Sequence, residues 1–247
     1  MNLLKYRFAQ LVSSAQRAKP EYELHRRVLM YHSINQNSDS DTYSISERNF
    51  AAHVGLITEH CDSENSKIVP LDSASKSGVT ITFDDGYQDT LTVAAKILGA
   101  KKLPFTVFVT SQNITLGNSN YLSQSQLIEL SKIPEVTIGS HGHSHAHLAE
   151  LPSLEIHNEL RQSKEWLEQT IQKPVTTLSY PHGSFNAEVV RLAADTGYKF
   201  AATSKWGVYQ VGTGLLEIPR IDVWGRDTKR ILQQKLCGKW NWITDFI

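Results

Sequence analysis

Short runs of apolar and β-branched residues recur along the 247-residue chain, and within each run the apolar character is nearly continuous. Continuous rather than alternating apolar runs are typical of parallel strands that are buried on both faces. Helical patterns separate the runs, which indicates βαβ units and a parallel sheet. The predicted strands are 27–32, 79–83, 104–109, 135–141, 176–181, 199–204 and 215–222, and the predicted helices are 88–102, 123–133, 151–171 and 186–197.

The number of strands, seven in a chain of this length, favours one α/β barrel over two separate sheets. Polar residues gather at the predicted carboxyl ends of these strands, which is the rim where barrel enzymes carry out their chemistry. We therefore expect one functional site at this rim. Its candidate residues are His32, Asp84, Asp85, His141, Pro181, His182, Arg220 and Asp222.

The composition excludes several classes of protein. Hydrophobic residues make up 40% of the chain, and 25 basic residues balance 25 acidic ones. This balance gives no basic footprint, so we expect no nucleic-acid partner. The two cysteines, Cys61 and Cys237, favour free thiols in a reducing compartment. We find no apolar run of about 18 residues and no signal peptide, and we expect a cytoplasmic protein.

Residues 1–26 are predicted to form a helical extension before a barrel domain at 27–247. Apolar residues recur there at helical spacing with basic residues around them: Leu4, Phe8, Leu11 and Val12, and Lys5, Arg7, Arg17 and Lys19. Such a helix can pack across one end of the barrel, or it can lie on an anionic membrane surface, here the inner face of the membrane. The sequence leaves both interpretations open.

Two neighbouring aspartates and a histidine-rich segment suggest a metal site. His141 and His145 are four residues apart and can face one point. Two imidazoles and one carboxylate form a three-ligand site with an open position for water, as in catalytic zinc sites, and the second carboxylate is then free to act as a base. His143 and His147 have the same spacing, so periodicity does not choose between the pairs. A solvated loop and an ordinary turn at Asp84–Gly86 are the alternatives.

Three segments in this order resemble the motifs of the polysaccharide deacetylases of the NodB-homology type, a family of carbohydrate esterases. They are TFDDGY (82–87), SHGHSHAHL (140–148) and SYPHGSFN (179–186). The resemblance implies a distorted (β/α)7 barrel. It also implies that Asp84 is the general base and that Asp85, His141 and His145 bind one divalent metal ion. Zn²⁺ suits these ligands best, and Co²⁺ and Ni²⁺ are also compatible with them.

The third motif departs from the pattern of familiar members, in which an Arg and a Tyr stand where this chain has Ser179 and His182. A late catalytic histidine is also missing, because no histidine follows Trp224. The segments VLMYHSI (28–34) and IPRIDVW (218–224) resemble instead the branch that includes the poly-N-acetylglucosamine deacetylases. That branch implies His32 as the general acid.

Arg220 and Asp222 are assigned roles that the missing Arg of the third motif and the missing late histidine leave unfilled. Arg220 is expected to replace the missing Arg as the partner that keeps Asp84 ionised. Asp222 is expected to orient His32 or to pair with Arg220.

The resemblance implies a metal-dependent hydrolase that removes acetyl groups from N-acetylated sugars of a polysaccharide or a glycolipid precursor. A water molecule would attack the acetyl carbonyl and Asp84 would accept its proton. Cleavage of O-acetyl esters, and a catalytically silent glycan-binding protein, are the alternatives. The oligomeric state stays open. The expected substrate contacts are Tyr180, Pro181, His182 and Trp224, whereas Tyr43 and Phe50 are expected to pack in the protein.

Overall fold

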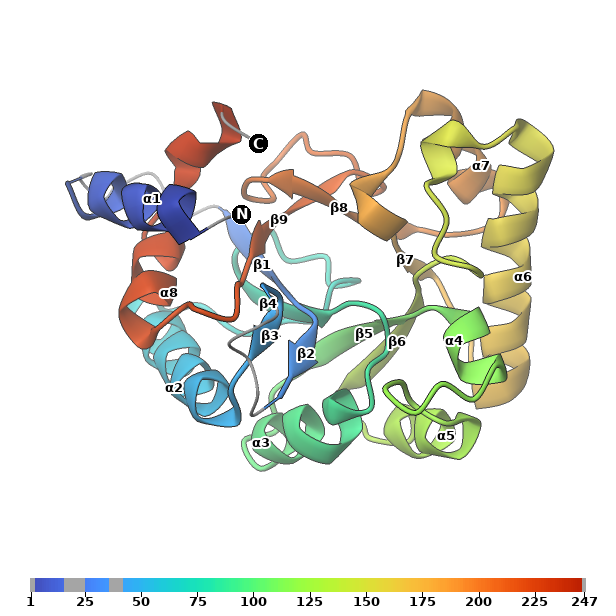
Figure 1. The fold of residues 1–247 in the computed structure, drawn as a ribbon, viewed down its shortest axis with the longest axis horizontal. Coiled ribbons are helices and arrows are strands. Elements are labelled where there is room, and N and C mark those ends of the chain that lie inside the picture. The colour runs from blue at the N-terminus through green and yellow to red at the C-terminus, as the bar shows by residue number, and fades with distance from the viewer. Residues whose placement is uncertain (1–2, 16–24, 36–41, 246–247) are drawn as a thin grey trace.

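The computed structural model describes residues 3–15, 25–35 and 42–245. Seven parallel strands form a closed barrel in the order β1-β4-β5-β6-β7-β8-β9, and β9 pairs with β1 to close it (Figure 1). The strands are β1 Arg26–Tyr31, β4 Gly78–Phe83, β5 Phe105–Val109, β6 Val136–Ser140, β7 Thr177–Ser179, β8 Phe200–Trp206 and β9 Ile218–Asp222. The predicted barrel is therefore confirmed, and each strand lies within a few residues of its predicted position.

Helices cover the outside of the barrel (Figure 1). They are α1 Leu3–Ala15, α2 Glu47–Ser63, α3 Ala95–Gly99, α4 Ser111–Thr115, α5 Gln124–Ser131, α6 Ser153–Ile171, α7 Ala187–Asp195 and α8 Lys229–Leu236. A π-helical turn, Thr90–Ala94, precedes α3, and 3-10 turns span Leu148–Glu150, Pro181–Gly183 and Asn241–Asp245. Two short strands outside the barrel, β2 Ser33–Ile34 and β3 Ser44–Ile45, pair with each other.

Neither α2 nor α8 is predicted from the apolar runs. In α2 the signal is present, because Phe50, Val54, Ile57 and Cys61 are all buried and follow helical spacing. Ser46 caps this helix, since its Oγ accepts a hydrogen bond from the backbone N–H of Asn49. The apolar pattern of this segment is hard to recognise because the polar residues of the exposed face interrupt it.

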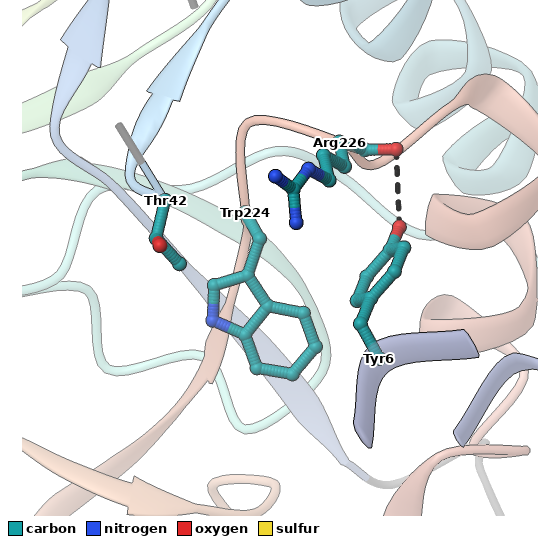
Figure 2. A pocket seen from close by; sticks show the side chains of 4 residues that line it. All are labelled: Tyr6, Thr42, Trp224 and Arg226. Atoms are coloured by element: carbon teal, nitrogen blue, oxygen red, sulfur yellow. Dashed lines mark hydrogen bonds between the residues drawn. The ribbon is translucent and has the colours of Figure 1, made fainter. Parts of the chain in front are cut away.

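Helix α1 packs against α8 and the turn that follows β9. Tyr6 is buried, its ring meets that of Trp224 edge-on, and its hydroxyl donates to the carbonyl of Arg226, as Figure 2 shows. The opposite face of the helix carries Phe8 and Leu11, which are 65% and 73% exposed. The inward face therefore matches the packed interpretation, and membrane contact stays a prediction. Arg17 and Lys19 lie outside the described residues. No helix in the described ranges is long and apolar enough to cross a bilayer.

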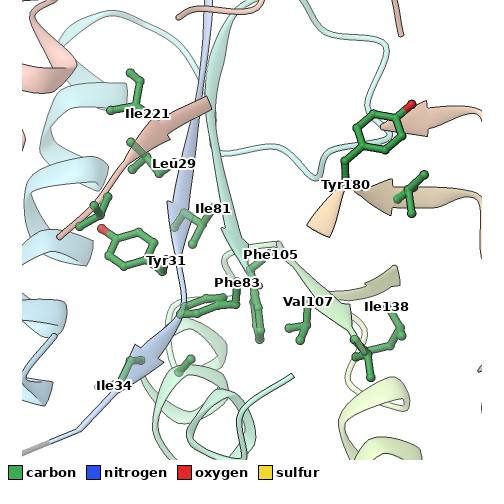
Figure 3. Packing of buried hydrophobic residues seen from close by; sticks show 14 of the residues in the cluster. Leu29, Tyr31, Ile34, Ile81, Phe83, Phe105, Val107, Ile138, Tyr180 and Ile221 are labelled. Atoms are coloured by element: carbon green, nitrogen blue, oxygen red, sulfur yellow. The ribbon is translucent and has the colours of Figure 1, made fainter. Parts of the chain in front are cut away.

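The barrel wall separates two clusters of buried side chains. The larger cluster joins strand residues such as Leu29, Ile81 and Phe83 to helix residues such as Phe50, and Figure 3 shows its strand side chains next to one another. The smaller cluster joins residues of strands that are not all neighbours, and it therefore fills the interior. Its members are Val28, Leu71, Phe108, Ala202, Tyr209 and Ile218.

The interior becomes polar toward the carboxyl ends of the strands. Side chains alternate along a strand, so Thr80, Thr82 and Asp84 of the β4 segment lie on the face opposite Ile81 and Phe83. All three are buried. Both faces of the strand are thus buried, as predicted, but the inner face is lined with threonine and ends in a carboxylate. This arrangement places Asp84 at the centre of the rim.

Gly139 of β6 provides a test of how tightly the wall is packed. A methyl group at this position would lie 2.5 Å from Cδ1 of Phe108 and 2.5 Å from Oγ1 of Thr177. We expect Gly139→Ala to lower the free energy of unfolding by about 1–3 kcal/mol. Gly55 in α2 is the control, because a methyl group there meets nothing within 4 Å. Gly55→Ala should raise the free energy of unfolding by about 0.5–1 kcal/mol. Urea denaturation measures both, and equal stability of the two variants would contradict the packing.

Candidate active site

A cavity of about 380 Å³ opens at the carboxyl ends of the barrel strands. Ligand sites typically have volumes of roughly 300–1,000 Å³. The cavity is lined by Met30, His32, Tyr43, Asp84, Asp85, His141, His145, Tyr180, His182, Ser204 and Asp222. The structure thus brings together most of the residues expected at this rim. Pro181 is buried and is not part of the lining.

Asp85, His141 and His145 form a candidate metal site. Oδ1 of Asp85 lies 3.4 Å from Nε2 of His141 and 3.2 Å from Nε2 of His145. The ligand atoms of the three residues all lie within 4.8 Å of one another. The other histidine pair is used differently, because Nδ1 of His143 hydrogen-bonds to Ser111 and the ring of His147 stacks on His182. The structure therefore groups His141 and His145, rather than His143 and His147, with Asp85.

The donor atoms of this site are set up to bind a cation. Nδ1 of His141 lies 2.8 Å from the carbonyl oxygen of Ser179, to which it donates a hydrogen bond. Its Nε2 faces Asp85, and this nitrogen can donate to the carboxylate when it is protonated or offer its lone pair to a cation when it is not. Burial alone would raise the pKa of Asp85, but hydrogen bonds from His141 and His145 hold it well below its usual range. Asp85 is therefore an ionised carboxylate between two imidazoles.

The backbone at this site adopts conformations that are uncommon for residues other than glycine. Asp85, His145 and His182 have φ angles of 72°, 66° and 56°. Such left-handed conformations are costly for residues with a side chain and tend to occur at functional sites. All three residues line the cavity.

The loop that carries His145 is held by Glu159 of α6. Its carboxylate accepts hydrogen bonds from the backbone N–H groups of His143 and Ser144, both at 2.9 Å, and from the hydroxyl of Ser144 at 2.7 Å. Glu159 was not predicted as a site residue, because nothing in the sequence distinguishes it from the other acidic residues of its helix.

Asp84 is paired with Arg220 inside the barrel. The guanidinium binds the carboxylate through two hydrogen bonds, each of 2.7 Å. Burial alone would raise the pKa of Asp84, but Arg220 and then His141 lower it to about 2. Ser179 joins the pair, because its hydroxyl accepts from Arg220 and donates to Asp84. The predicted pairing of Asp84 with Arg220 is thus present in the structure.

His32 and Asp222 lie on the wall next to Asp84. Nδ1 of His32 and Oδ1 of Asp222 are both buried, and neither has a hydrogen-bond partner within the described part of the chain. Burial raises the pKa of the Asp222 carboxyl, and the charge of His32 acts in the opposite direction. Within the described part of the chain, Asp222 forms neither a hydrogen bond with His32 nor an ion pair with Arg220, so both of its expected roles stay predictions.

A family model described as polysaccharide deacetylase matches residues 72–201, which is more than half of the chain. The chain belongs to the polysaccharide deacetylase family. The matched segment contains Asp84, Asp85, His141, His145 and His182. His32, Arg220 and Asp222 lie outside it.

One curated relative is similar in sequence, and two solved structures are similar in fold. YxkH of Bacillus subtilis (strain 168), whose name places it provisionally among the polysaccharide deacetylases, is 28% identical over 202 residues, which are 79% of this chain and 70% of that protein. BC0361, a polysaccharide deacetylase from Bacillus cereus, has a TM-score of 0.74 at 25% identity, over 86% of this chain and 69% of that one. The Streptococcus pyogenes deacetylase PplD has a TM-score of 0.72 at 22% identity, over 85% of this chain and 97% of that one, and shows likeness of fold alone.

Trp224 was expected to contact the sugar, and the structure places it elsewhere. It is 5% exposed and packs among Tyr6, Trp206 and Trp240, outside the cavity. The reason is a buried cation, since Nζ of Lys235 lies 3.6 Å from the centre of the Trp224 ring. The indole ring therefore packs on the ammonium group of Lys235 instead of facing the cavity.

Asp227 holds the turn after β9 in place. Its carboxylate accepts hydrogen bonds from the hydroxyl of Tyr6 at 2.9 Å, from Nζ of Lys235 at 2.5 Å and from the backbone N–H of Trp224 at 3.0 Å. Lys235 also donates to the backbone carbonyl of Asp222 at 2.6 Å. The exit of β9, and with it Asp222, is thus fixed by one buried ion pair.

The aromatic residues near the cavity divide into buried and accessible ones. Tyr180 reaches the lining but is buried, with its hydroxyl bonded to the carbonyl of Leu216 and its ring stacked on Phe185. Phe50 is fully buried, as expected. Tyr43 was expected to pack as well, but it is 39% exposed and lines the cavity.

The Arg220–Asp84 pair can be tested by a double-mutant cycle. Arg220→Gln leaves a buried carboxylate without its cation and should lower the free energy of unfolding by about 3–5 kcal/mol. Asp84→Asn in the same chain should restore part of this loss. Denaturation in the presence of a chelator gives the free energies of unfolding of the wild type, the two single variants and the double variant, without any contribution from a metal.

The exposed pair Arg161–Glu165 of α6 is the matched control, because its nitrogen–oxygen distance of 2.9 Å is also short. Arg161→Gln should lower the free energy of unfolding by less than about 1 kcal/mol. Additive effects of the two buried substitutions would contradict a direct interaction between Asp84 and Arg220.

Proposed function

We propose that this protein is a metal-dependent deacetylase that hydrolyses the acetamido group of N-acetylated sugars in a polysaccharide or a glycolipid precursor. One observation carries the proposal: three candidate metal ligands converge next to an ionised carboxylate in a cavity of suitable size. Membership of the polysaccharide deacetylase family supports it. So does the likeness of fold to PplD, whose structure was solved in complex with acetate.

Asp85, His141 and His145 would hold the metal. The three donors fit a divalent cation, because Oδ1 of Asp85 lies 3.4 Å and 3.2 Å from the Nε2 atoms of His141 and His145, and all three residues line the cavity. This donor set suits Zn²⁺ and is compatible with Co²⁺ and Ni²⁺. When bound, such a cation polarises the acetyl carbonyl and lowers the pKa of water to about 7.

Asp84 is the proposed general base. Its carboxylate is ionised at neutral pH, and Arg220 fixes its direction through two hydrogen bonds. A carboxylate with a pKa of about 2 is a weak base. Asp84 can therefore accept a proton only from a water molecule that is already acidified, which fits a position next to the proposed metal ligands.

His32 is the proposed general acid. It lines the same cavity as Asp84, and Asp222 is its electrostatic neighbour. A protonated His32 can donate to the leaving nitrogen, since an amine is a poor leaving group without a proton. The backbone N–H of His182 is the proposed donor to the oxyanion, in a turn whose φ angle of 56° is held in place by the ring contacts of His182 with His145 and His147.

Metal binding and proton transfer can be separated by two neighbouring substitutions. Asp85→Ala should lose the metal, whereas Asp84→Asn should retain it and lower the rate of acetate release by about 10²–10⁴-fold. Metal content by mass spectrometry and acetate release from N-acetylglucosamine oligomers measure the two effects. Asp62→Asn, at an exposed position in α2, is the control and should change neither.

Two outcomes would overturn these assignments. A full equivalent of metal in both Asp85→Ala and His141→Ala would remove the ligand assignment. A wild-type protein that binds metal and glycan but releases no acetate would favour the silent glycan-binding alternative.

The role of His32 can be tested with two leaving groups. His32→Gln should lower cleavage of an N-acetylated sugar by about 10²–10⁴-fold, because the amine needs a proton to leave. Cleavage of an aryl acetate should fall much less, because a phenolate leaves without one. Acetate release from both substrates gives the comparison, and an equal fall on both would contradict the acid role. The same pair of substrates shows whether the site also accepts O-acetyl esters.

A further inference from the structure

Tyr43 presents an accessible aromatic ring to the cavity. It is 39% exposed, whereas Tyr180, another tyrosine of the lining, is fully buried. His182 is exposed as well, but its ring already lies parallel to that of His147 at a centroid distance of 4.0 Å and meets the edge of His145. Within the described lining of the cavity, Tyr43 therefore offers the best aromatic surface to a ligand.

The backbone on both sides of Tyr43 is fixed. The carbonyl of Thr42 accepts a hydrogen bond of 2.7 Å from the N–H of Gly225, and Ser44 pairs with Ser33 in the β2–β3 sheet. Figure 2 shows Thr42 next to the ring of Trp224. The exposed side chain is thus carried by a backbone that is held by the exit of β9 and by the strand that follows His32.

A half-buried carboxylate, that of Asp89, holds this small sheet in place. Oδ2 of Asp89 accepts hydrogen bonds from the hydroxyl of Ser33 and from the backbone N–H of Ile34, both at 2.9 Å. Asp89 follows the aspartate pair of β4 by a few residues. The small sheet that precedes and follows Tyr43 in the chain is thus linked through Asp89 to the segment that carries Asp84 and Asp85.

The chemistry of the cavity indicates what this ring could bind. Most of the lining consists of charged or hydrogen-bonding side chains, which suit the acetyl group and the hydroxyls of a sugar. A pyranose ring also has an apolar C–H face, which packs well on an aromatic ring. A small acyclic amide or ester has no such face.

We propose that Tyr43 contacts the pyranose ring that carries the acetyl group and selects cyclic N-acetylated sugars over small acetyl compounds. This inference rests on the proposed function and assigns a specificity residue to the same site. The ring of Tyr43 also lies 4.6 Å from that of His32, centroid to centroid. A purely structural role would therefore act through His32, and the test must separate the two roles.

The variants are Tyr43→Leu, which removes the aromatic face, and Tyr43→Phe, which keeps it. Val211→Ala is the control, because Val211 is 74% exposed and lies near Tyr209, which pairs with Arg26 at the amino end of β1. The ligands are β-1,4- and β-1,6-linked pentamers of N-acetylglucosamine and an acyclic alkyl acetate, which has no ring to pack on Tyr43. Binding of the pentamers is measured by calorimetry in an Asp84→Asn background, and acetate release is measured in the wild-type background.

We expect Tyr43→Leu to weaken binding of the preferred pentamer about 10-fold, with a matching rise in KM, a smaller change in kcat and an unchanged melting temperature. Tyr43→Phe should restore most of the affinity. The loss of kcat/KM on the pentamer should exceed the loss on the alkyl acetate by at least about 5-fold.

Three results would overturn the inference. They are unchanged pentamer binding in Tyr43→Leu, an equal fall in kcat/KM on the pentamer and on the acetate ester, and no binding of either pentamer by the Asp84→Asn protein that retains Tyr43. The proposed function fails separately. If the wild type releases no acetate but pentamer binding depends on Tyr43, the contact stands and the hydrolase assignment does not.

Discussion

The buried ion pair between Arg220 and Asp84 is the interaction on which the rest of the site depends. Two charges inside a barrel are costly unless every polar atom is satisfied. Here the five N–H donors of Arg220 reach Asp84, Thr82, Ser179 and the carbonyl of Thr203. These partners come from β4, β7 and β8. The guanidinium therefore ties four strands together and leaves the Asp84 carboxylate one defined direction.

This constraint explains how two adjacent aspartates can have different tasks. Asp84 continues the alternation of β4 and points inward to Arg220. Asp85 leaves the strand with a φ angle of 72°, which turns its carboxylate toward His141 and His145. The strained backbone thus separates two groups that the sequence places side by side. Ser179 completes the arrangement, because a small hydroxyl at the end of β7 leaves space for an arginine that reaches in from β9.

The sequence predicted the strands of the barrel and the residues at its rim, because both depend on local order: apolar runs, and polar residues at their ends. It failed where burial depends on distant partners. Trp224 is buried because its ring packs on the ammonium group of Lys235, which is paired with Asp227. Tyr43 directly precedes the short strand β3, and its ring lies 4.6 Å from that of His32, centroid to centroid, at the cavity. Glu159, in α6, accepts hydrogen bonds from the backbone of the loop that carries His145. No spacing in the sequence predicts that contact.

Strand β9 combines two roles that are usually separate. It pairs with β1 and so closes the barrel, and it carries Arg220 and Asp222 into the site. During synthesis, which proceeds from the amino end, Asp84, Asp85, His141 and His145 all leave the ribosome before β9 exists. A nascent chain can thus contain every proposed metal ligand while Asp84 still lacks its partner Arg220. The strand that closes the barrel therefore also delivers the cation that pairs with Asp84, so the two steps of assembly coincide.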